Sequence, residues 1–207
     1  MCGQWRNTES PALAASATLP TGLGDLRYAM LRSQIANLFG IGSMRFCTQQ
    51  ECEGWLVARQ RQKPDAVPDM CTERFGFPSD PYRLFFVARW IATSITHRMP
   101  TLLWITEWGI WPSSENWHLY YRLRQTYSDH RLLHEAPGHL FLEHEAEDLA
   151  SFLQIAMQSG WGGYVLTQAD YVNAFFSHDE YIDFFAGVDA NLADVRNELA
   201  TGPRAAG

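Results

Sequence analysis

The feature that most constrains the fold is a short run of large apolar residues in the middle of the chain, from Leu102 to Ile105. A continuous apolar run of this length, without polar alternation, is typical of a β-strand that is covered on both faces. Pro100 precedes the run, and Gly109 and Pro112 follow it, so residues that favour turns bound it on both sides. The run therefore predicts a central, buried strand.

A capped helix is predicted directly after this strand, over residues 115–127. Ser113 and Ser114 stand at its start, where a serine accepts a hydrogen bond from a free backbone N–H of the first helical turn. Arg124 falls within the apolar arc of this helix, so its guanidinium must pair with an acid, stack on an aromatic ring or extend outward. Glu107, at the end of the strand, is the expected partner of Arg124.

The segment between the strand and the helix is the candidate site. In open α/β sheets, ligands bind beyond the carboxyl ends of the strands, next to helix N-termini. A pocket there would have tryptophan walls and a carboxylate as a polar anchor. The alternative is that the tryptophans belong to the core and the serines only cap the helix. The predicted ligand- or partner-binding residues are Glu107, Trp108, Trp111, Ser113, Ser114 and Arg124.

Length and charge narrow the class of protein. A chain of 207 residues has the usual size of one domain and buries enough surface to fold without disulfides or metals. The net charge is −7 and Lys63 is the only lysine, so the basic surface of a nucleic-acid-binding protein is missing. No apolar run approaches the roughly 18 residues of a membrane span, so neither nucleic acid nor membrane is predicted as a partner.

The spacing of the cysteines indicates the redox compartment of the protein. Cys2, Cys47, Cys52 and Cys71 form neither a CxxC pair nor the framework of a disulfide-rich secreted domain. The N-terminus also lacks the basic and apolar regions of a secretory signal. We therefore predict reduced thiols in a cytoplasmic protein.

The histidines raise the question of a metal site, because five of the seven lie between His118 and His144. On a strand, His139 and Glu143 would share one face, whereas His144 would point to the other. His134 does not complete an HExxH or comparable spacing. No metal and no cofactor is predicted, since a GxSxG motif, a P-loop and a dinucleotide fingerprint are missing as well.

The whole pattern predicts one α/β domain over 23–200, with a flexible arm at 1–22 and a frayed end at 201–207. We expect a mixed or mostly parallel sheet of about five to six short strands with helices packed on it, plus an N-terminal helix. Capping-box spacings, in Thr48 with Glu51 and in Ser177 with Glu180, predict that a helix begins after each. The other expected helices are 25–39, 81–97, 145–159 and 189–200; the other expected strands are 44–47, 164–167, 171–176 and one on each side of Pro137-Gly138; and 64–79 is expected to be a loop.

Two classes of function fit this sequence. The preferred hypothesis is a non-catalytic protein-interaction module, with an immunity or antitoxin-like role as one version. It rests on the missing catalytic motifs, the acidic charge and the helix at 81–97. This helix is apolar on two sides, so it is either buried between layers or covered by the helix at 25–39 or by a partner. A homodimer through this helix or through the helix at 25–39 is one form of that partnership. The alternative is a small-molecule-binding protein or enzyme in which Glu107 is a general acid or base.

Overall fold

The computed structural model describes residues 45–59, 63, 70–97, 99–109, 117–167 and 172–201. The predicted arm at 1–22 and the predicted helix at 25–39 lie outside these residues. Trp111, Ser113 and Ser114 of the predicted site lie outside them too.

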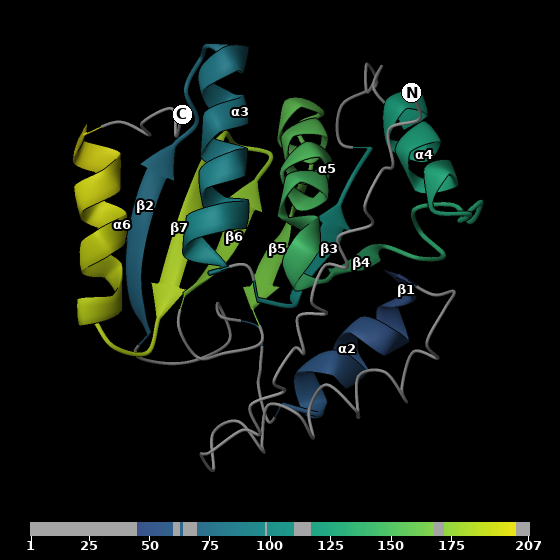
Figure 1. The fold of residues 1–207 in the computed structure, drawn as a ribbon, viewed down its shortest axis with the longest axis horizontal. Coiled ribbons are helices and arrows are strands. Elements are labelled where there is room, and N and C mark those ends of the chain that lie inside the picture. Colours follow the sequence, from purple (N-terminus) through teal and green to yellow (C-terminus); the bar gives the residue numbers. More distant parts are fainter. Residues whose placement is uncertain are drawn as a thin grey trace, which may run out of the picture. The chain divides into compact units, whose positions relative to one another are not determined.

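Seven strands form a single sheet in the described part of the chain, in the order β1-β4-β3-β5-β6-β7-β2 (Figure 1). Every neighbouring pair is antiparallel. The strands are β1 Phe46–Cys47, β2 Cys71–Gly76, β3 Thr101–Glu107, β4 Gly138–Phe141, β5 Gly162–Thr167, β6 Asn173–Ser177 and β7 Tyr181–Ala186. The predicted strand at 102–105 is confirmed as part of β3, which lies between β4 and β5.

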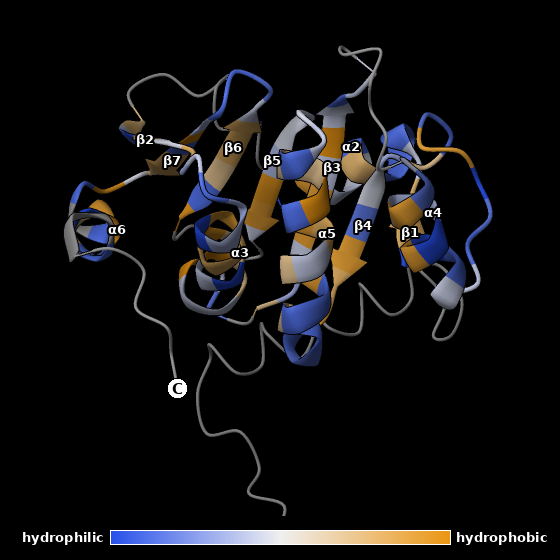
Figure 2. Cartoon of the chain, turned by 90° about the horizontal axis from the view of Figure 1, so that it is seen from above, coloured by the Kyte–Doolittle hydropathy of each residue, from blue (hydrophilic) through white to orange (hydrophobic). Residues whose placement is uncertain are grey.

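Helices cover one face of this sheet. Figures 1 and 2 show α3, α5 and α6 side by side on that face, and α4 packs beside α5. The helical segments are α2 Gln49–Val57, α3 Pro81–Trp90, the π-helix η2 Ile91–Ile95, α4 Trp117–Thr126, the 3-10 helix η3 Glu143–Glu145, α5 Ala146–Gln158 and α6 Ala190–Thr201. Among the described residues, no helix combines the length and the apolar character needed to cross a membrane.

The core lies between the sheet and these helices. Alternate residues of the strands face α3 and α5, and they include Leu103, Ile105, Val165, Phe176 and Phe184. Burying one such side chain stabilises the fold by about 1.5–3 kcal/mol. The residues between them on β3 are buried as well, so the strand is covered on both faces, as the apolar run predicts.

The predicted sheet type and strand number were wrong, because two strands were missed. Residues 181–186 were expected to be helical after the Ser177–Glu180 capping box, but they form β7. Ser177 and Glu180 instead close a tight turn between β6 and β7, in which the Glu180 N–H donates to the Ser177 carbonyl at 3.1 Å. Glu180 has a φ of 62°, which a helix start does not use. Strands joined by so short a turn must be antiparallel.

The second missed strand is β2, which lies within the predicted loop at 64–79. It forms an edge of the sheet, and its residues alternate between half-buried and exposed, so the apolar pattern of a core strand is absent. The strand expected before Pro137 was wrong too: residues 133–135 form a turn. The Pro137 carbonyl accepts a hydrogen bond from the Ile105 N–H at 3.0 Å.

The helices predicted after Thr48, at 81–97 and at 145–159 were confirmed in their starts or ends. Thr48 and Glu51 form the predicted capping box at the start of α2. The Asp80 side chain caps α3 by accepting from the Tyr82 N–H at 2.9 Å. Gly160 follows α5 with a φ of 63°, a left-handed conformation that favours glycine after a helix.

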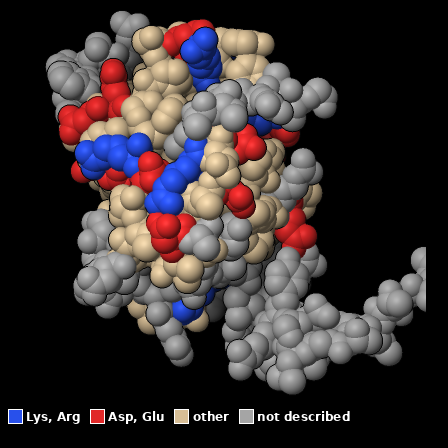
Figure 3. Space-filling model, turned by 90° about the vertical axis from the view of Figure 1, so that its left-hand side faces the viewer, with Lys and Arg blue, Asp and Glu red and all other residues tan. Residues whose placement is uncertain are grey.

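Charged side chains of both signs lie together at the β2 edge. Figure 3 views the molecule from the side of β2 and α6 and shows basic and acidic side chains in contact there. Arg74 makes two bonds of 2.7 Å to the Asp183 carboxylate, and Arg196 of α6 binds both Glu73 and Asp189. Charges on an edge strand discourage pairing with a foreign strand.

Candidate functional site

A β-bulge near the end of β3 decides where Glu107 points. Ile105 pairs with Gly163, but Glu107 pairs with Gly162, so Thr106 is an extra residue in this strand. Without it, Glu107 would share the helix-covered face with Ile105. The extra residue moves Glu107 to the second face of the sheet, the face on which Trp104 lies.

Gly162 makes room for the Glu107 side chain. A Cβ atom at Gly162 would lie 2.4 Å from Oε2 of Glu107 and 3.2 Å from its Cβ. The carboxylate therefore occupies the space above the neighbouring strand that any other residue at position 162 would fill. From there it reaches across β5 toward β6 and β7.

His178, in the turn between β6 and β7, meets this carboxylate. Its Nδ1 lies 2.9 Å from Oε2 of Glu107, although the two residues are 71 positions apart in sequence. The other ring nitrogen, Nε2, lies 3.5 Å from Oδ1 of Asp179. Both members of the pair are partly open to solvent, with 41% of the Glu107 side chain and 27% of the His178 side chain exposed.

This arrangement is suited to proton transfer. An ionised carboxylate only accepts hydrogen bonds, so Glu107 favours the imidazole tautomer that carries its proton on Nδ1. Nε2 is then an acceptor, and it forms no hydrogen bond with the ionised Asp179 carboxylate 3.5 Å away, because that group also only accepts. His178 can therefore take a proton from a group that approaches Nε2.

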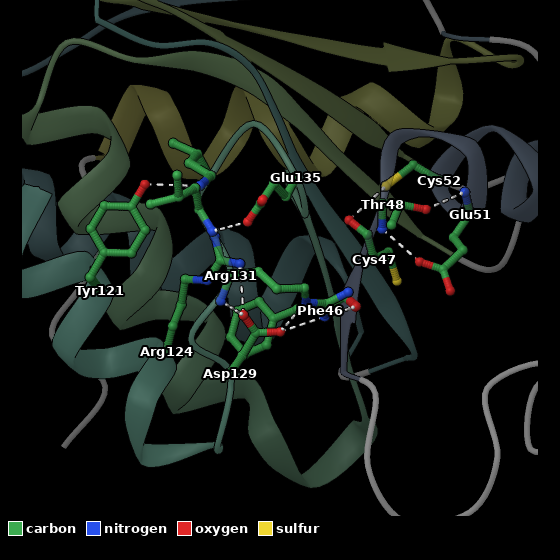
Figure 4. Close-up of polar contacts among 12 residues, drawn as sticks. Phe46, Cys47, Thr48, Glu51, Cys52, Tyr121, Arg124, Asp129, Arg131 and Glu135 are labelled. Carbon is green, nitrogen blue, oxygen red and sulfur yellow. Dashed lines mark hydrogen bonds and ion pairs between the residues drawn. The ribbon is translucent and has the colours of Figure 1, made fainter.

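The other predicted site residues do not join Glu107. Trp108 is half-buried and packs against the core between sheet and helices. Arg124 is completely buried and binds Oδ1 of Asp129 at 3.0 Å, so the predicted pair between Arg124 and Glu107 was wrong (Figure 4). Arg124 also stacks on the Phe46 ring, with its Cζ 4.6 Å from the ring centre.

Asp129 links two arginines to the first strand. Its carboxylate accepts from Arg124 and from Nε of Arg131 at 2.8 Å, and Arg131 donates to the Phe46 carbonyl at 2.8 Å (Figure 4). Burial alone would raise the pKa of Asp129, but the hydrogen bonds from Arg131 and Arg124 outweigh it and hold this pKa below its ordinary value of 3.8. The network is structural, because it fixes α4 and the following loop to β1.

His139 is part of β4, where it pairs with Phe46 of β1, and it is fully buried. Neither of its ring nitrogens has a hydrogen-bond partner among the described residues. Burial, and then the positive charges of Arg45 and Arg124, hold the pKa of His139 well below its ordinary value of 6.5. In the part of the chain that the structure describes, no three His, Cys, Asp or Glu side chains are placed to hold a metal ion.

No known family model, curated protein or solved structure matches this chain. The site is therefore judged by its own geometry. Glu107 was predicted from the sequence, whereas His178, Asp179 and Gly162 were missed. A hairpin turn at Ser177–Glu180, followed by the aromatic and β-branched residues of 181–186, is the signal that would have brought His178 to the end of β3.

Proposed function

We propose that the protein is an acid–base enzyme or a small-molecule-binding protein that acts through the Glu107–His178 pair. The observation that supports this most is the 2.9 Å contact between Oε2 of Glu107 and Nδ1 of His178 above Gly162. Three adjacent strands converge on this pair, so its geometry is fixed by the sheet. Glu107 and Gly162 are strand residues, and His178 directly follows the last residue of β6.

Aromatic rings follow one another on the same face of the sheet; Trp104 and Tyr164 are buried beneath Lys63, and Arg74 stacks on Tyr181. The ring centres of Trp104 and Tyr164 are 6.4 Å apart, those of Tyr164 and Phe175 are 5.0 Å apart, and those of Phe175 and Tyr181 are 6.4 Å apart. Phe175 and Tyr181, the two rings on β6 and β7, are half-buried. Organic ligands bind where apolar surface lies next to a few fixed polar groups.

The chemistry of the pair favours proton transfer over attack by a protein nucleophile. Within the described residues, the groups that contact the ring nitrogens of His178 are the carboxylates of Glu107 and Asp179. Catalysis by a serine, threonine or cysteine nucleophile would require its hydroxyl or thiol within hydrogen-bond reach of that ring. His178 is therefore assigned as the base that accepts a proton from a ligand or a water molecule, and Glu107 as the group that orients it.

A thermal-shift screen with small organic compounds tests the proposal on four proteins: wild type, Glu107→Gln, His178→Gln and the control His134→Gln, whose side chain is exposed. A ligand of this site should stabilise wild type and the control but not the two site variants. Equal stabilisation of all four proteins, or no stabilisation of wild type by any compound, would contradict the proposed function.

A second candidate is the protein-interaction module, which one observation favours. The side of α3 that carries Leu84 and Val87 is buried in the core, but Tyr82 is 68% exposed. The Tyr82 ring meets Phe86 at 4.7 Å, and Phe86 meets Phe85 at 5.6 Å. Co-purification with lysate proteins, and light scattering for a homodimer, test this candidate. A Tyr82→Ser variant that keeps every association of the wild type would count against it.

A further inference from the structure

We propose that His139 is an acid-sensitive latch for the segment 45–59, which contains β1 and α2. The uncharged imidazole holds this segment on the sheet, and protonation of the ring releases it while the rest of the sheet stays folded.

Among the described elements, the backbone of the segment is attached to the sheet through β1. β1 has two residues at the sheet edge, where Phe46 pairs with His139 and Cys47 pairs with Gly138. The Arg45 carbonyl accepts from the Leu140 N–H at 2.7 Å. Side chains add to this attachment: the Phe46 ring centre lies 4.1 Å from that of His139, and Arg131 donates to the Phe46 carbonyl. Arg45 pairs with Glu145, and Cys52, Trp55 and Leu56 of α2 are buried. A change at His139 therefore acts on the centre of this attachment.

The surroundings of the His139 imidazole stabilise its neutral form over its charged form. His139 lies between the rings of Phe46, Phe141 and Phe152, with centres 4.1, 3.6 and 4.6 Å away. Neither nitrogen has a partner in the described part of the chain. A charged imidazolium has two N–H donors, and burying them unpaired costs several kcal/mol.

Charged groups face the ring from each element around it. Arg45 comes from the β1 side and pairs with Glu145 of η3, and Arg124 comes from α4 and pairs with Asp129. Tyr127 follows α4, with its ring 5.7 Å from that of His139, and interacts with Asp148 of α5. On the side of β3, the residue paired with His139 is Leu103, which carries no charge. The two arginines are the charges that oppose a third cation here.

The direction in which pH acts follows from the pKa of His139 in the closed and in the released state. In the closed state, burial and then the charges of Arg45 and Arg124 hold the pKa of His139 well below its ordinary value of 6.5. Release removes Phe46 and Arg45 and opens the ring to solvent, so this pKa rises toward the ordinary value. Only the released state therefore binds the proton as the pH falls below 6.5. Each further pH unit favours release by up to about tenfold, until the pKa of the closed state is reached.

Two cysteines report on release directly. Cys47 and Cys52 lie in the segment and are buried free thiols, and the Cys52 Sγ rests against Gly138 of β4. Cys71, on β2 at the opposite edge of the sheet, is half-buried and serves as an internal reference. Lifting β1 and α2 from the sheet exposes the first two thiols and leaves the third unchanged.

The test combines hydrogen exchange and thiol labelling of the full chain at about pH 7.5 and about pH 5.5. Exchange is corrected for its intrinsic pH dependence, and dithiodipyridine is the thiol reagent. At the lower pH, opening of 45–59 and labelling of Cys47 and Cys52 should rise roughly tenfold, while β5, β6 and β7 stay protected. The exposed neighbour His144, changed to Gln, should behave as wild type.

Two variants make the result decisive. His139→Phe should abolish the acid response, because no proton can bind. If that variant does not fold, Arg45→Gln replaces it: removing one of the opposing cations should reduce the ratio between the two pH values. The latch is refuted if the corrected opening of 45–59 is equal at both pH values, if β5–β7 open together with it, or if the variant that folds keeps the full wild-type response.

Discussion

Gly162 and Gly163 are neighbours in β5, but their replacement by alanine should have different consequences. A Cβ at Gly162 meets Oε2 of Glu107 at 2.4 Å, and that oxygen is the end of a flexible side chain that can move away. The move breaks the bond to His178, which costs about 0.5–1.5 kcal/mol. Losing the conformational freedom of glycine in the unfolded chain returns about 0.4–1 kcal/mol. The free energy of unfolding should therefore change by less than about 1 kcal/mol.

In Gly163→Ala, the added Cβ atom would instead meet backbone atoms of β3. Its Cβ would lie 2.4 Å from the Trp104 carbonyl oxygen and 3.0 Å from both the Ile105 Cα and the Phe176 Cζ. β3 and β5 must separate to accept it, and overpacking of this kind costs about 2–3 kcal/mol. Position 163 is thus required by the fold, and position 162 by the site.

Two measurements separate these outcomes. Urea unfolding gives the stability of each variant, and the ¹⁵N chemical shifts of the His178 ring report which nitrogen carries the proton. Gly162→Ala should keep near wild-type stability and lose the preference for the Nδ1–H tautomer, because Glu107 no longer accepts from it. The reasoning is refuted if that tautomer is retained, or if Gly162→Ala is as destabilising as Gly163→Ala.

Three further predictions concern stability and are checked by urea unfolding. Asp129→Asn should lower the free energy of unfolding by about 3–5 kcal/mol, because it leaves the buried Arg124 without its carboxylate. Arg124→Met removes the buried charge and should cost clearly less. Equal losses in the two variants would contradict this. Since the pKa of Asp129 lies below 3.8, its stabilisation is present above that pH and is lost as the pH falls through the native value; Asp129→Asn should lack this part of the acid profile. Leu103→Ala should cost about 2–5 kcal/mol, and Val57→Ala, at an exposed position of α2, less than about 0.5 kcal/mol.

Two local signals in the sequence were sufficient to predict an element of the structure. The apolar run at 102–105 predicted a strand buried on both faces, because burial on two sides removes the need for polar alternation. The pair Thr48 and Glu51 predicted a helix start, because both bonds of a capping box lie within four residues. Ser177 and Glu180 have the same spacing but close a hairpin, since a serine–glutamate spacing is compatible with a strand after it as well as with a helix.

Pairing between segments far apart in the sequence could not be predicted from the residues around each segment. The edge strand β2 is bound to β7 and α6 through ion pairs of residues more than 100 positions apart, and nothing in its own pattern marks it as a strand. For the same reason Glu107 was assigned to Arg124, the nearer group in sequence, although a one-residue bulge turns it to the other face and to His178. The constraint on Arg124 itself was correct: inside an apolar arc, it both pairs and stacks.

The order of the strands has a consequence for synthesis on the ribosome. β1 and β2, the strands at the two edges, are translated first, yet Phe46 pairs with His139 and Cys71 with Ala186. The emerging chain therefore carries β1 unpaired until β4 has been made and β2 unpaired until β7 has been made, and closing these long loops is slow. A nascent chain of this kind depends on chaperones for longer than one in which each strand joins its predecessor.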